Sequence, residues 1–307
     1  MSMREAKQEK FCPICSEAMQ NKICTYTYYC EGCGYWAAFL QPNINSQDDF
    51  VFSEERNDKD VLSFLDKIRI RNFNLILDKI DSRGARDVLN ILDVGCASGL
   101  FLKIAGERGH ITTGIEPNPV MAKIALGKGF DVVNGYFPDA IQPTSKFDLI
   151  IFNDVFEHIP DLNEILNSCN IFLNDGGMLI ISLPNSGGIF FRLAKLLAMV
   201  GALGPWDRLW QVMFYTPHLH YFCSGSLDSL LKKHDFENKS EYIEIEAVSL
   251  HGLWDRLAID SSRHLLSRIF MYIGIVVFYP ITKLFQQDAF FSIYEKRVST
   301  TSQRSKQ

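Results

Sequence analysis

The sequence predicts an α/β protein: a parallel sheet with helices on both faces, preceded by a small cysteine-rich unit. From residue 87 onward, strand-like and helix-like segments alternate, and glycine-containing turns separate several of them. Parallel strands need crossover helices, which cover both faces of the sheet. Before this region, residues 11–40 contain two C-x2-C pairs and many aromatic residues but no long apolar run. Such a unit has little core of its own and is typical of a metal-held domain.

The alternating elements can be placed one after another. A lead-in helix is predicted between Val61 and Ile80, where apolar residues recur at helical spacing. The clearest later helix covers 161–173, because Asp161 can cap its first turn and Glu164 follows three residues on. We expect this helix to stop at a turn over 174–177. The other predicted elements are strand 88–94, helix 98–109, strand 111–117, helix 119–129, strands 130–133, 147–154 and 178–184, helix 226–236 and strand 288–296.

These elements suggest a division into three parts. We place a zinc ribbon at 1–45, a polar linker with the lead-in helix at 46–86, and the α/β domain at 87–307. Two segments interrupt the alternation of this domain: an aromatic-rich insertion at about 185–222 and an apolar helical segment at about 250–286. An insertion of this length after a central strand is where an α/β enzyme can build a substrate lid.

Size and charge limit the classes of function. A chain of 307 residues can bury a substantial core, and its 31 Lys+Arg against 36 Asp+Glu give a formal net charge of -5. Proteins that hold a polyanion usually have a basic excess, so nucleic-acid binding is disfavoured. The opening stretch MSMREAKQEK lacks the apolar region of a signal peptide. We therefore expect a cytoplasmic protein whose cysteines are thiols or metal ligands rather than disulfides.

The stretch ILDVGCASGLF, residues 91–101, places small residues at the end of the first predicted strand. Ligands of doubly wound sheets bind beyond the carboxyl ends of the strands, and small residues let the backbone approach them. The amide groups of the next helix can then face an anionic group. A dinucleotide fits poorly, because its fingerprint needs glycine where Ala97 and Leu100 stand. A plain strand-to-helix turn is the alternative to a ligand loop.

Five motifs resemble those of class I S-adenosylmethionine-dependent methyltransferases, and they occur in that family's order. They are LDVGCASGLF (92–101), GIEPNP (114–119), FDLIIFNDVFEHIPD (147–161), LNDGGMLIISLPN (173–185) and HLHYFCSGSLDSLLKKHDF (218–236). The resemblance covers about residues 60–297. It implies a seven-stranded Rossmann-like methyltransferase sheet and an enzyme that uses S-adenosyl-L-methionine.

The resemblance also implies which residues contact this cofactor. Glu116 would accept hydrogen bonds from the two ribose hydroxyls, which suits a carboxylate. The family often places an acidic residue near the adenine, but here Tyr136 follows the third strand and Asp139 comes later, so Tyr136 is our candidate. The methionine portion is assigned to Asp93 and to the backbone of the glycine-rich loop. The full predicted set is Asp93, Gly95, Ala97, Gly99, Glu116, Tyr136 and Asn153.

Methyl transfer to a hydroxyl needs an aligned nucleophile and a base, and histidine is the natural base near neutral pH. We predict His220, beside the insertion, and His158, after the fourth strand, as the catalytic candidates; His218 lies in the same segment as His220. Other interpretations stay open. Glu157 and His158 can orient the next helix, or they can hold a divalent metal together with Asp154, as in some small-molecule O-methyltransferases. His220 can be a packed histidine.

The cysteines of FCPICSEAMQ and YYCEGCGYW have the spacing C-x2-C-x14-C-x2-C. Two knuckles at this distance suit four thiolates around one tetrahedral Zn²⁺, with no open position for catalysis. We therefore predict Cys12, Cys15, Cys30 and Cys33 as ligands of a structural zinc ion, with disulfides as the alternative. Similar ribbons precede methyltransferase domains in bacterial enzymes that modify sugars and glycans, and also occur in RNA-modifying enzymes.

Two apolar stretches, 189–203 and about 270–279, are too short to span a bilayer. Arg192 and Lys195 in the first would suit a helix that lies on a membrane surface. Burial inside the fold and packing in a homodimer are the alternatives.

The predicted function is methyl transfer from S-adenosyl-L-methionine to an oxygen of a small molecule, sugar or glycan, lipid-linked glycans included. One alternative is an RNA or protein methyltransferase that uses the ribbon to dock its substrate. Another is a non-catalytic zinc-ribbon interaction protein. The expected location is the cytoplasm, with or without peripheral contact with a membrane.

Overall fold

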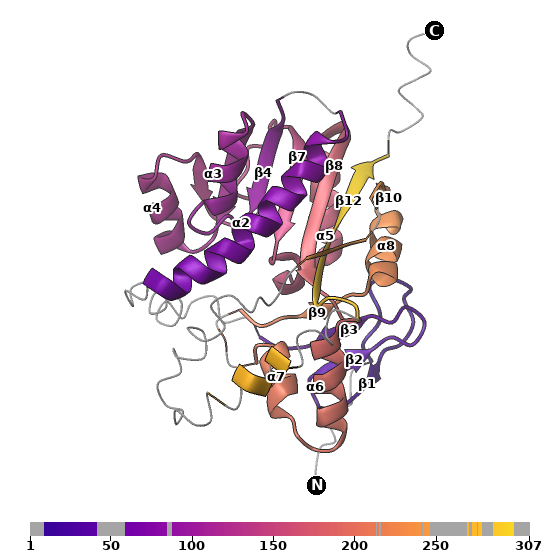
Figure 1. The fold of residues 1–307 in the computed structure, drawn as a ribbon. Coiled ribbons are helices and arrows are strands. Elements are labelled where there is room, and N and C mark those ends of the chain that lie inside the picture. Colours follow the sequence, from indigo (N-terminus) through magenta and orange to yellow (C-terminus); the bar gives the residue numbers. More distant parts are fainter. Residues whose placement is uncertain are drawn as a thin grey trace.

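The structure, a computed structural model, describes residues 9–41, 59–84, 88–212, 214, 216–240, 242–245, 269, 272–274, 276–277 and 285–297. The predicted linker up to residue 58, and nearly all of the predicted apolar segment at 250–286, lie outside the described residues. Figure 1 shows a large sheet flanked by helices and, beside it, a small sheet that packs with two short helices.

The large sheet has the strand order β10-β12-β8-β7-β4-β5-β6, with β11 also paired to β12. Five neighbouring strands, from β8 to β6, are parallel, and β12 runs antiparallel to β8. These seven positions confirm the predicted seven-stranded Rossmann-like sheet. The strands are β4 (Asn90–Val94), β5 (Ile111–Glu116), β6 (Val132–Asn134), β7 (Phe147–Asn153), β8 (Leu173–Pro184), β10 (Phe236–Asn238), β11 (Ile243–Ile245) and β12 (Ala289–Lys296).

Successive side chains of the central strands enter different cores, because a strand projects them to alternate faces. Ile91 of β4 packs in the core that contains Ile76 and Phe101, whereas Leu92 packs in the core that contains Leu166 and Leu230. Both faces of the sheet are therefore buried, which explains the near-continuous apolar strands. The covering helices are α2 (Lys59–Asp81), α3 (Leu100–Glu107), α4 (Pro119–Gly127), α5 (Leu162–Phe172) and α8 (Ser224–Lys233).

The structure agrees with the sequence prediction at the start of α5 but differs from it in β8. Asp161 caps α5 as predicted, accepting a hydrogen bond of 3.0 Å from the backbone N–H of Glu164. The turn predicted at 174–177 instead lies within β8, where the register against β7 shifts between Phe147 and Leu149. The polar residues form a bulge rather than a separate turn, because Leu173 already pairs with Phe147.

The small sheet joins distant parts of the chain. Its strands are β1 (Gln20–Asn21), β2 (Thr27–Tyr29), β3 (Trp36–Ala38) and β9 (His220–Tyr221), and each pairs antiparallel with the next. The insertion after β8 forms α6 (Ile189–Met199) and α7 (Gly204–Leu209). Trp36 of β3 packs with Phe191 of α6 and with Trp206 of α7 in a separate core. The cysteine-rich unit and the insertion thus form one packed body.

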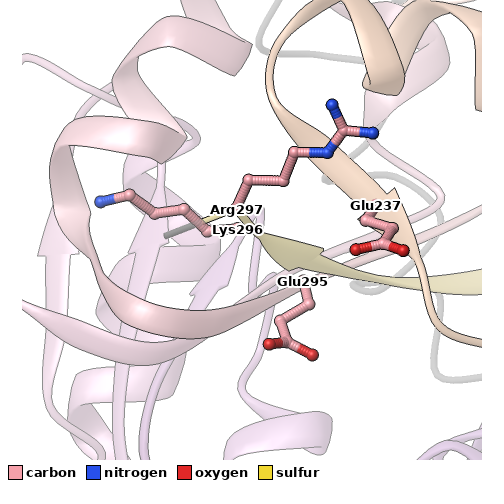
Figure 2. Close-up of a pocket in the computed structure, with 4 residues that line it drawn as sticks. All are labelled: Glu237, Glu295, Lys296 and Arg297. Carbon is pink, nitrogen blue, oxygen red and sulfur yellow. The ribbon is translucent and has the colours of Figure 1, made fainter. Parts of the chain in front are cut away.

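Within the described residues, no helix is long and apolar enough to cross a membrane. A pocket of about 280 Å³ lies at the carboxyl end of β12, lined by Glu237, Glu295, Lys296 and Arg297. Since Glu295 pairs with Met178 near the start of β8, this pocket lies at the amino edge of the parallel strands. Figure 2 shows its four side chains pointing in different directions rather than to a common centre. The pocket is therefore not the candidate site.

Candidate active site

The predicted cofactor residues gather at the carboxyl edge of the parallel strands. Strand β4 lies between β5 and β7, so Asp93 near its end has Glu116, the last residue of β5, on one side and Asn153, the last residue of β7, on the other. Central strands of this kind create the crevice in which doubly wound sheets bind ligands.

The loop after β4 is shaped by its small residues. Gly95 has φ 77° and Gly99 has φ 85°, a left-handed conformation that glycine adopts without steric strain. A Cβ on Gly95 would lie 2.5 Å from Val155, and one on Gly99 would lie 2.4 Å from Phe130. Ala97 takes φ 46° in spite of its own Cβ. The loop backbone thus lies close to Val155, which follows β7, and to Phe130, which precedes β6.

Glu116 is buried and held by two backbone amides. Its Oε2 accepts a hydrogen bond of 2.9 Å from Ala97 N–H, and its Oε1 accepts one of 2.8 Å from Asn118 N–H. Burial raises the pKa of Glu116, while these two hydrogen bonds act in the opposite direction. A carboxylate oxygen has a second lone pair, so each oxygen can still accept a hydrogen bond from a diol. The side chain is therefore preorganised as an acceptor pair.

Asp93 and Asn153 carry buried polar atoms without a hydrogen bond of good geometry in the described part of the chain: Oδ1 of Asp93, and both Oδ1 and Nδ2 of Asn153. Burial, followed by the charge of Glu116, raises the pKa of Asp93 to about 7. The amide of Asn153 still lies close enough to Asp93 to act against the rise of its pKa. Native proteins satisfy nearly all buried polar groups, so neighbouring unsatisfied groups beside a ligand crevice indicate partners supplied by a ligand. These residues fit a cofactor that carries polar and cationic groups.

Tyr136 lies near the same carboxylate, just after β6. Its side chain is half exposed, and burial followed by the charge of Glu116 raises its pKa. Asn134 ties the two strand ends together, because its Nδ2 donates to the carbonyl oxygen of Glu116 over 2.7 Å. The structure thus places Tyr136 at the edge of the crevice, where an exposed ring can cover a bound heterocycle.

His158 belongs to the short helix η1 (Phe156–His158), which follows β7. Its Nδ1 lies 2.9 Å from the carbonyl oxygen of Pro217. A carbonyl oxygen can only accept, so Nδ1 carries the proton and Nε2 keeps its lone pair. No other described residue forms a hydrogen bond with Nε2 of His158. Burial lowers the pKa of His158, so the imidazole is neutral near pH 7 and able to accept a proton.

Glu157 and His218 lie beside His158. One ligand atom from each of these three side chains lies within 4.8 Å of the others. Burial, with the charge of Asp154 second, raises the pKa of Glu157 well above its usual range, and its Oε1 is 4.0 Å from Nε2 of His218. The metal group weighed from the sequence included Asp154, but that side chain is exposed and His218 takes its place in the cluster.

Both ring nitrogens of His218 have partners. Its Nε2 lies 2.9 Å from the side-chain amide nitrogen of Gln211, which can only donate. Its Nδ1 donates over 3.1 Å to the hydroxyl of Tyr221, which in turn donates to the carbonyl oxygen of Leu209. Burial lowers the pKa of His218 to about 3. His218 is therefore a neutral ring held by the insertion.

His220, the first of the predicted bases, is buried with both nitrogens engaged inside the chain. Its Nε2 donates over 2.8 Å to the carbonyl oxygen of Ile159, and its Nδ1 is bonded to the hydroxyl of Tyr35. Burial lowers its pKa to about 4. Both nitrogens of His220 therefore take part in hydrogen bonds within the protein. Its catalytic role stays an untested prediction. Of the two predicted bases, only His158 has a nitrogen with no partner among the described residues.

Sequence reasoning missed Tyr35 and Gln211. Tyr35 contacts a residue 185 positions away in the chain, and Gln211 contacts one seven positions away in an irregular segment. Tyr35 lies in the second cysteine knuckle, YYCEGCGYW, but is not one of its predicted ligands, and Gln211 lies in no motif that we singled out. Only the folded arrangement therefore identifies their contacts.

The four predicted zinc ligands come together, with their sulfur atoms all within 4.8 Å of one another. The two knuckles have the same backbone geometry. Cys12 N–H donates to Glu17 O and Cys30 N–H to Tyr35 O, both over 2.9 Å. Ser16 and Gly34, one residue beyond each knuckle, have positive φ values of 64° and 68°.

None of the four cysteines forms a disulfide bond. Four sulfurs converging on one point with a closed shell fit a tetrahedral zinc ion. The cluster is thus consistent with the predicted ribbon, and the disulfide alternative does not match the structure.

Comparison with known proteins identifies the fold family. The sequence profile of a family described as a methyltransferase domain matches residues 61–241. The chain belongs to this methyltransferase family. The predicted S-adenosylmethionine-dependent enzyme class is thereby confirmed, and the matched range runs from α2 through β10.

Related methyltransferases agree with this assignment. The chain is 31% identical over 123 residues to a ubiquinone biosynthesis O-methyltransferase of Xanthomonas oryzae pv. oryzae, covering 38% of this chain and 50% of the relative. It is 32% identical over 133 residues to the protein of that name from Xylella fastidiosa, covering 41% and 52%. The chain thus spans about half the length of these curated relatives.

The fold also resembles that of a solved structure, the cyclopropane synthase MmaA2 of Mycobacterium tuberculosis. The TM-score is 0.51 at 13% identity, and the match covers 74% of this chain and 84% of the synthase. At this identity the likeness concerns the fold alone.

Proposed function

We propose that the chain transfers a methyl group from S-adenosyl-L-methionine to a hydroxyl of a small molecule, with His158 as the general base. Sugars and lipid-linked glycans are included among the acceptors. The observation that carries the proposal is the neutral imidazole of His158, whose Nδ1 is held by Pro217 while Nε2 keeps a lone pair near the carboxyl end of β7. Two relatives whose names state O-methylation support an oxygen acceptor.

The cofactor residues have distinct roles in this proposal. Glu116 holds the ribose diol, because both its oxygens are preorganised and each has a lone pair to spare. Asp93 and the loop of Gly95, Ala97 and Gly99 hold the methionine portion, and Asn153 supplies an amide beside it. Tyr136 covers the adenine. When bound, the cofactor supplies an electrophilic methyl carbon on a sulfonium.

The reaction then needs little covalent participation by the protein. With the cofactor bound, the acceptor oxygen would take the methyl carbon from the sulfur, which would keep the electron pair of the broken bond, and the hydroxyl proton would move to Nε2 of His158. Positioning alone can contribute about 7–11 kcal/mol in favourable cases, and a base adds roughly 10²–10⁴-fold. Burial, with the charge of Asp154 second, raises the pKa of Glu157 and so favours its neutral form beside the acceptor.

Turnover with radiolabelled cofactor tests this function. A cell extract is separated into nucleic-acid, protein, lipid and small-molecule fractions, and each is incubated with the zinc-loaded protein. Label in the small-molecule or lipid fraction supports the proposal. Label confined to nucleic acid or protein contradicts it and favours the macromolecular alternative.

Replacing His158 by asparagine should lower kcat by roughly 10²–10⁴-fold while leaving cofactor affinity unchanged. Asparagine can still donate to the carbonyl oxygen of Pro217, so the change removes the base and keeps the local hydrogen bond. The matched control is His234→Asn, because His234 lies between Asn163 and Asn167 at the end of α8. Steady-state kinetics and calorimetry measure both effects, and full turnover of the variant would exclude His158 as the base.

Cofactor affinity should rise with pH up to about 7 and level off above it. The pKa of Asp93 is raised to about 7 by burial and by Glu116, so below that pH a cationic ligand must displace a proton and Kd increases up to tenfold per pH unit. The stability of the protein without ligand should depend on pH in the opposite direction. Because the pKa of this carboxyl group is higher in the folded than in the unfolded state, the fold loses stability as pH rises from about 4 to 7. Titration calorimetry across this range checks the profile. If Kd of an Asp93→Asn variant changed with pH as steeply as that of the wild type, Asp93 would not be the group that causes the pH dependence.

We also propose that α6 brings the enzyme to an anionic membrane surface. Leu196, Met199 and Val200 are 60%, 69% and 78% exposed on one apolar stretch. Arg192 is exposed on the same helix, whereas Lys195 is half-buried and lies over the rings of Trp36 and Tyr29. Apolar side chains flanked by basic ones are typical of interfacial helices.

Changing Leu196 and Met199 together to glutamate should reduce binding to anionic vesicles at least tenfold, because burying each side chain contributes about 1.5–3 kcal/mol. Co-sedimentation with phosphatidylglycerol vesicles measures it. Leu126→Glu, an exposed apolar residue on α4, is the control. Equal binding by wild type and double variant, or none by either, would exclude this surface.

A further inference from the structure

The ribbon is built into the wall of the candidate active site. Strand β3 pairs with β9, so that Ala37 lies opposite His220 and Trp36 opposite Tyr221, and Ala38 N–H donates to Leu219 O over 2.9 Å. On its other side, Leu219 N–H donates over 2.8 Å to the carbonyl oxygen of Glu157. The segment 217–221 is therefore held between the ribbon and η1.

A second connection runs through side chains. Tyr35 is buried, and its ring stacks on that of His220 with centroids 5.9 Å apart. Since Nε2 of His220 donates to the carbonyl oxygen of Ile159, Nδ1 must accept, and the Tyr35 hydroxyl is the donor. This gives a directed chain of hydrogen bonds from the ribbon to Ile159, the residue that follows His158. Both partners are buried, so removing the hydroxyl leaves an unpaired acceptor.

We infer that Tyr35 is a positioning residue, through which the ribbon orients the imidazole of His158. His158 takes its tautomer from Pro217, and Pro217 leads directly into the segment that β3 and Tyr35 hold. The segment also contributes His218 to the cluster beside Glu157. The importance of this orientation for catalysis rests on the proposed role of His158 as base. The orientation itself does not depend on that proposal.

This arrangement differs from that of a ribbon used as a separate docking module. The edge of β3 that could pair with a partner is occupied by β9. Tyr35, Trp36 and Ala37 are buried against the enzyme core and the insertion rather than displayed. These three ribbon side chains therefore serve the enzyme's own fold, whereas Phe11 and Phe39 of the ribbon are 59% and 48% exposed.

Ring-15N nuclear magnetic resonance of histidine in the zinc-loaded full chain tests the inference directly. His158 should give the signals of an Nδ1–H tautomer and His220 those of an Nε2–H tautomer, with assignments from His158→Asn and His220→Asn. Opposite tautomers at two nearby histidines are distinctive. Finding His158 as Nε2–H in the wild type would overturn the inference without any need for a further variant.

The Tyr35→Phe variant then tests the coupling. It keeps the stacked ring, so zinc content and cofactor Kd should stay within about twofold of the wild type. The 15N signals of His158 should move towards a tautomer average, and kcat should fall about tenfold with little change in KM. Tyr26→Phe is the matched control, because Tyr26 is a ribbon tyrosine that donates to Asp207 of α7 and not to a histidine.

The outcomes separate the two proposals. Unchanged His158 signals and unchanged kcat in Tyr35→Phe overturn the positioning role, as would equal effects in Tyr26→Phe. Full activity of His158→Asn, together with shifted His158 signals in Tyr35→Phe, would overturn the role of His158 as base while the positioning inference stands.

Discussion

Replacing Glu116 by alanine is expected to weaken binding of S-adenosyl-L-methionine by about 10²–10⁴-fold. The estimate follows from two lost hydrogen bonds to a charged group, each contributing about 1.5–3 kcal/mol. The carboxylate is fixed in advance by the amides of Ala97 and Asn118, so the ligand does not have to order it. Loss of this side chain therefore removes binding energy that a flexible surface glutamate would not provide.

Calorimetric titration with the cofactor and with S-adenosylhomocysteine measures the effect, because both share the ribose. Glu116→Gln separates charge from shape and should give an intermediate loss. The control is Glu107→Gln on α3, an exposed glutamate whose only ion pair is the surface contact with Lys103 within the described residues. Thermal unfolding without ligand checks that the loop after β4 survives the loss of its anchor. An unchanged Kd in Glu116→Ala would show that the ribose is held elsewhere and would remove the whole assignment of the crevice.

The cofactor side of the site could be predicted from the sequence because it depends on short-range order. Alternating patterns place the strands, and parallel strands necessarily bring their carboxyl ends to one edge. Asp93, Glu116 and Asn153 each end or nearly end a strand, so their meeting follows from the fold class alone. The cap at Asp161 is local in the same sense.

The catalytic side could not be predicted in this way. Whether a histidine offers a free nitrogen depends on which carbonyl or hydroxyl faces it, and those partners come from remote segments. His220 meets Tyr35 from 185 positions away, and His158 meets Pro217 from 59 positions away. The sequence alone therefore gives no basis for distinguishing these two histidines. Only the packing of the ribbon against β9 shows that both nitrogens of His220 are bonded, whereas Nε2 of His158 has no partner among the described residues.

We expect the Cys30→Ser variant to lose the predicted zinc ion and much of the protein's thermal stability. Cys30 is fully buried and shares one core with Phe152 of the large sheet and with Phe222, which follows β9. Structural zinc contributes directly to folding. A loss of only about 4 kcal/mol would lower Tm by roughly 8–16 °C in a domain of this size.

Elemental analysis of the purified protein and differential scanning calorimetry measure the two quantities. Cys24→Ser is the matched control, since Cys24 lies in the same ribbon but its sulfur contacts Thr27 rather than the cluster. It should keep one zinc ion per chain and the Tm of the wild type. Equal zinc loss in both variants, or a full complement in Cys30→Ser, would contradict the four-cysteine assignment.

Loss of zinc should also disorder the histidine-containing segment of the active site. Because β3 pairs with β9, a disordered ribbon leaves the amides of residues 220–221 without their strand partner. Hydrogen exchange at this segment should then accelerate in Cys30→Ser, while exchange in β4 and β5, which pair only within the large sheet, should change far less. Uniform acceleration across the chain would instead mean that zinc supports the fold as a whole, and protection retained at 220–221 would mean that the ribbon and the histidine segment are independent.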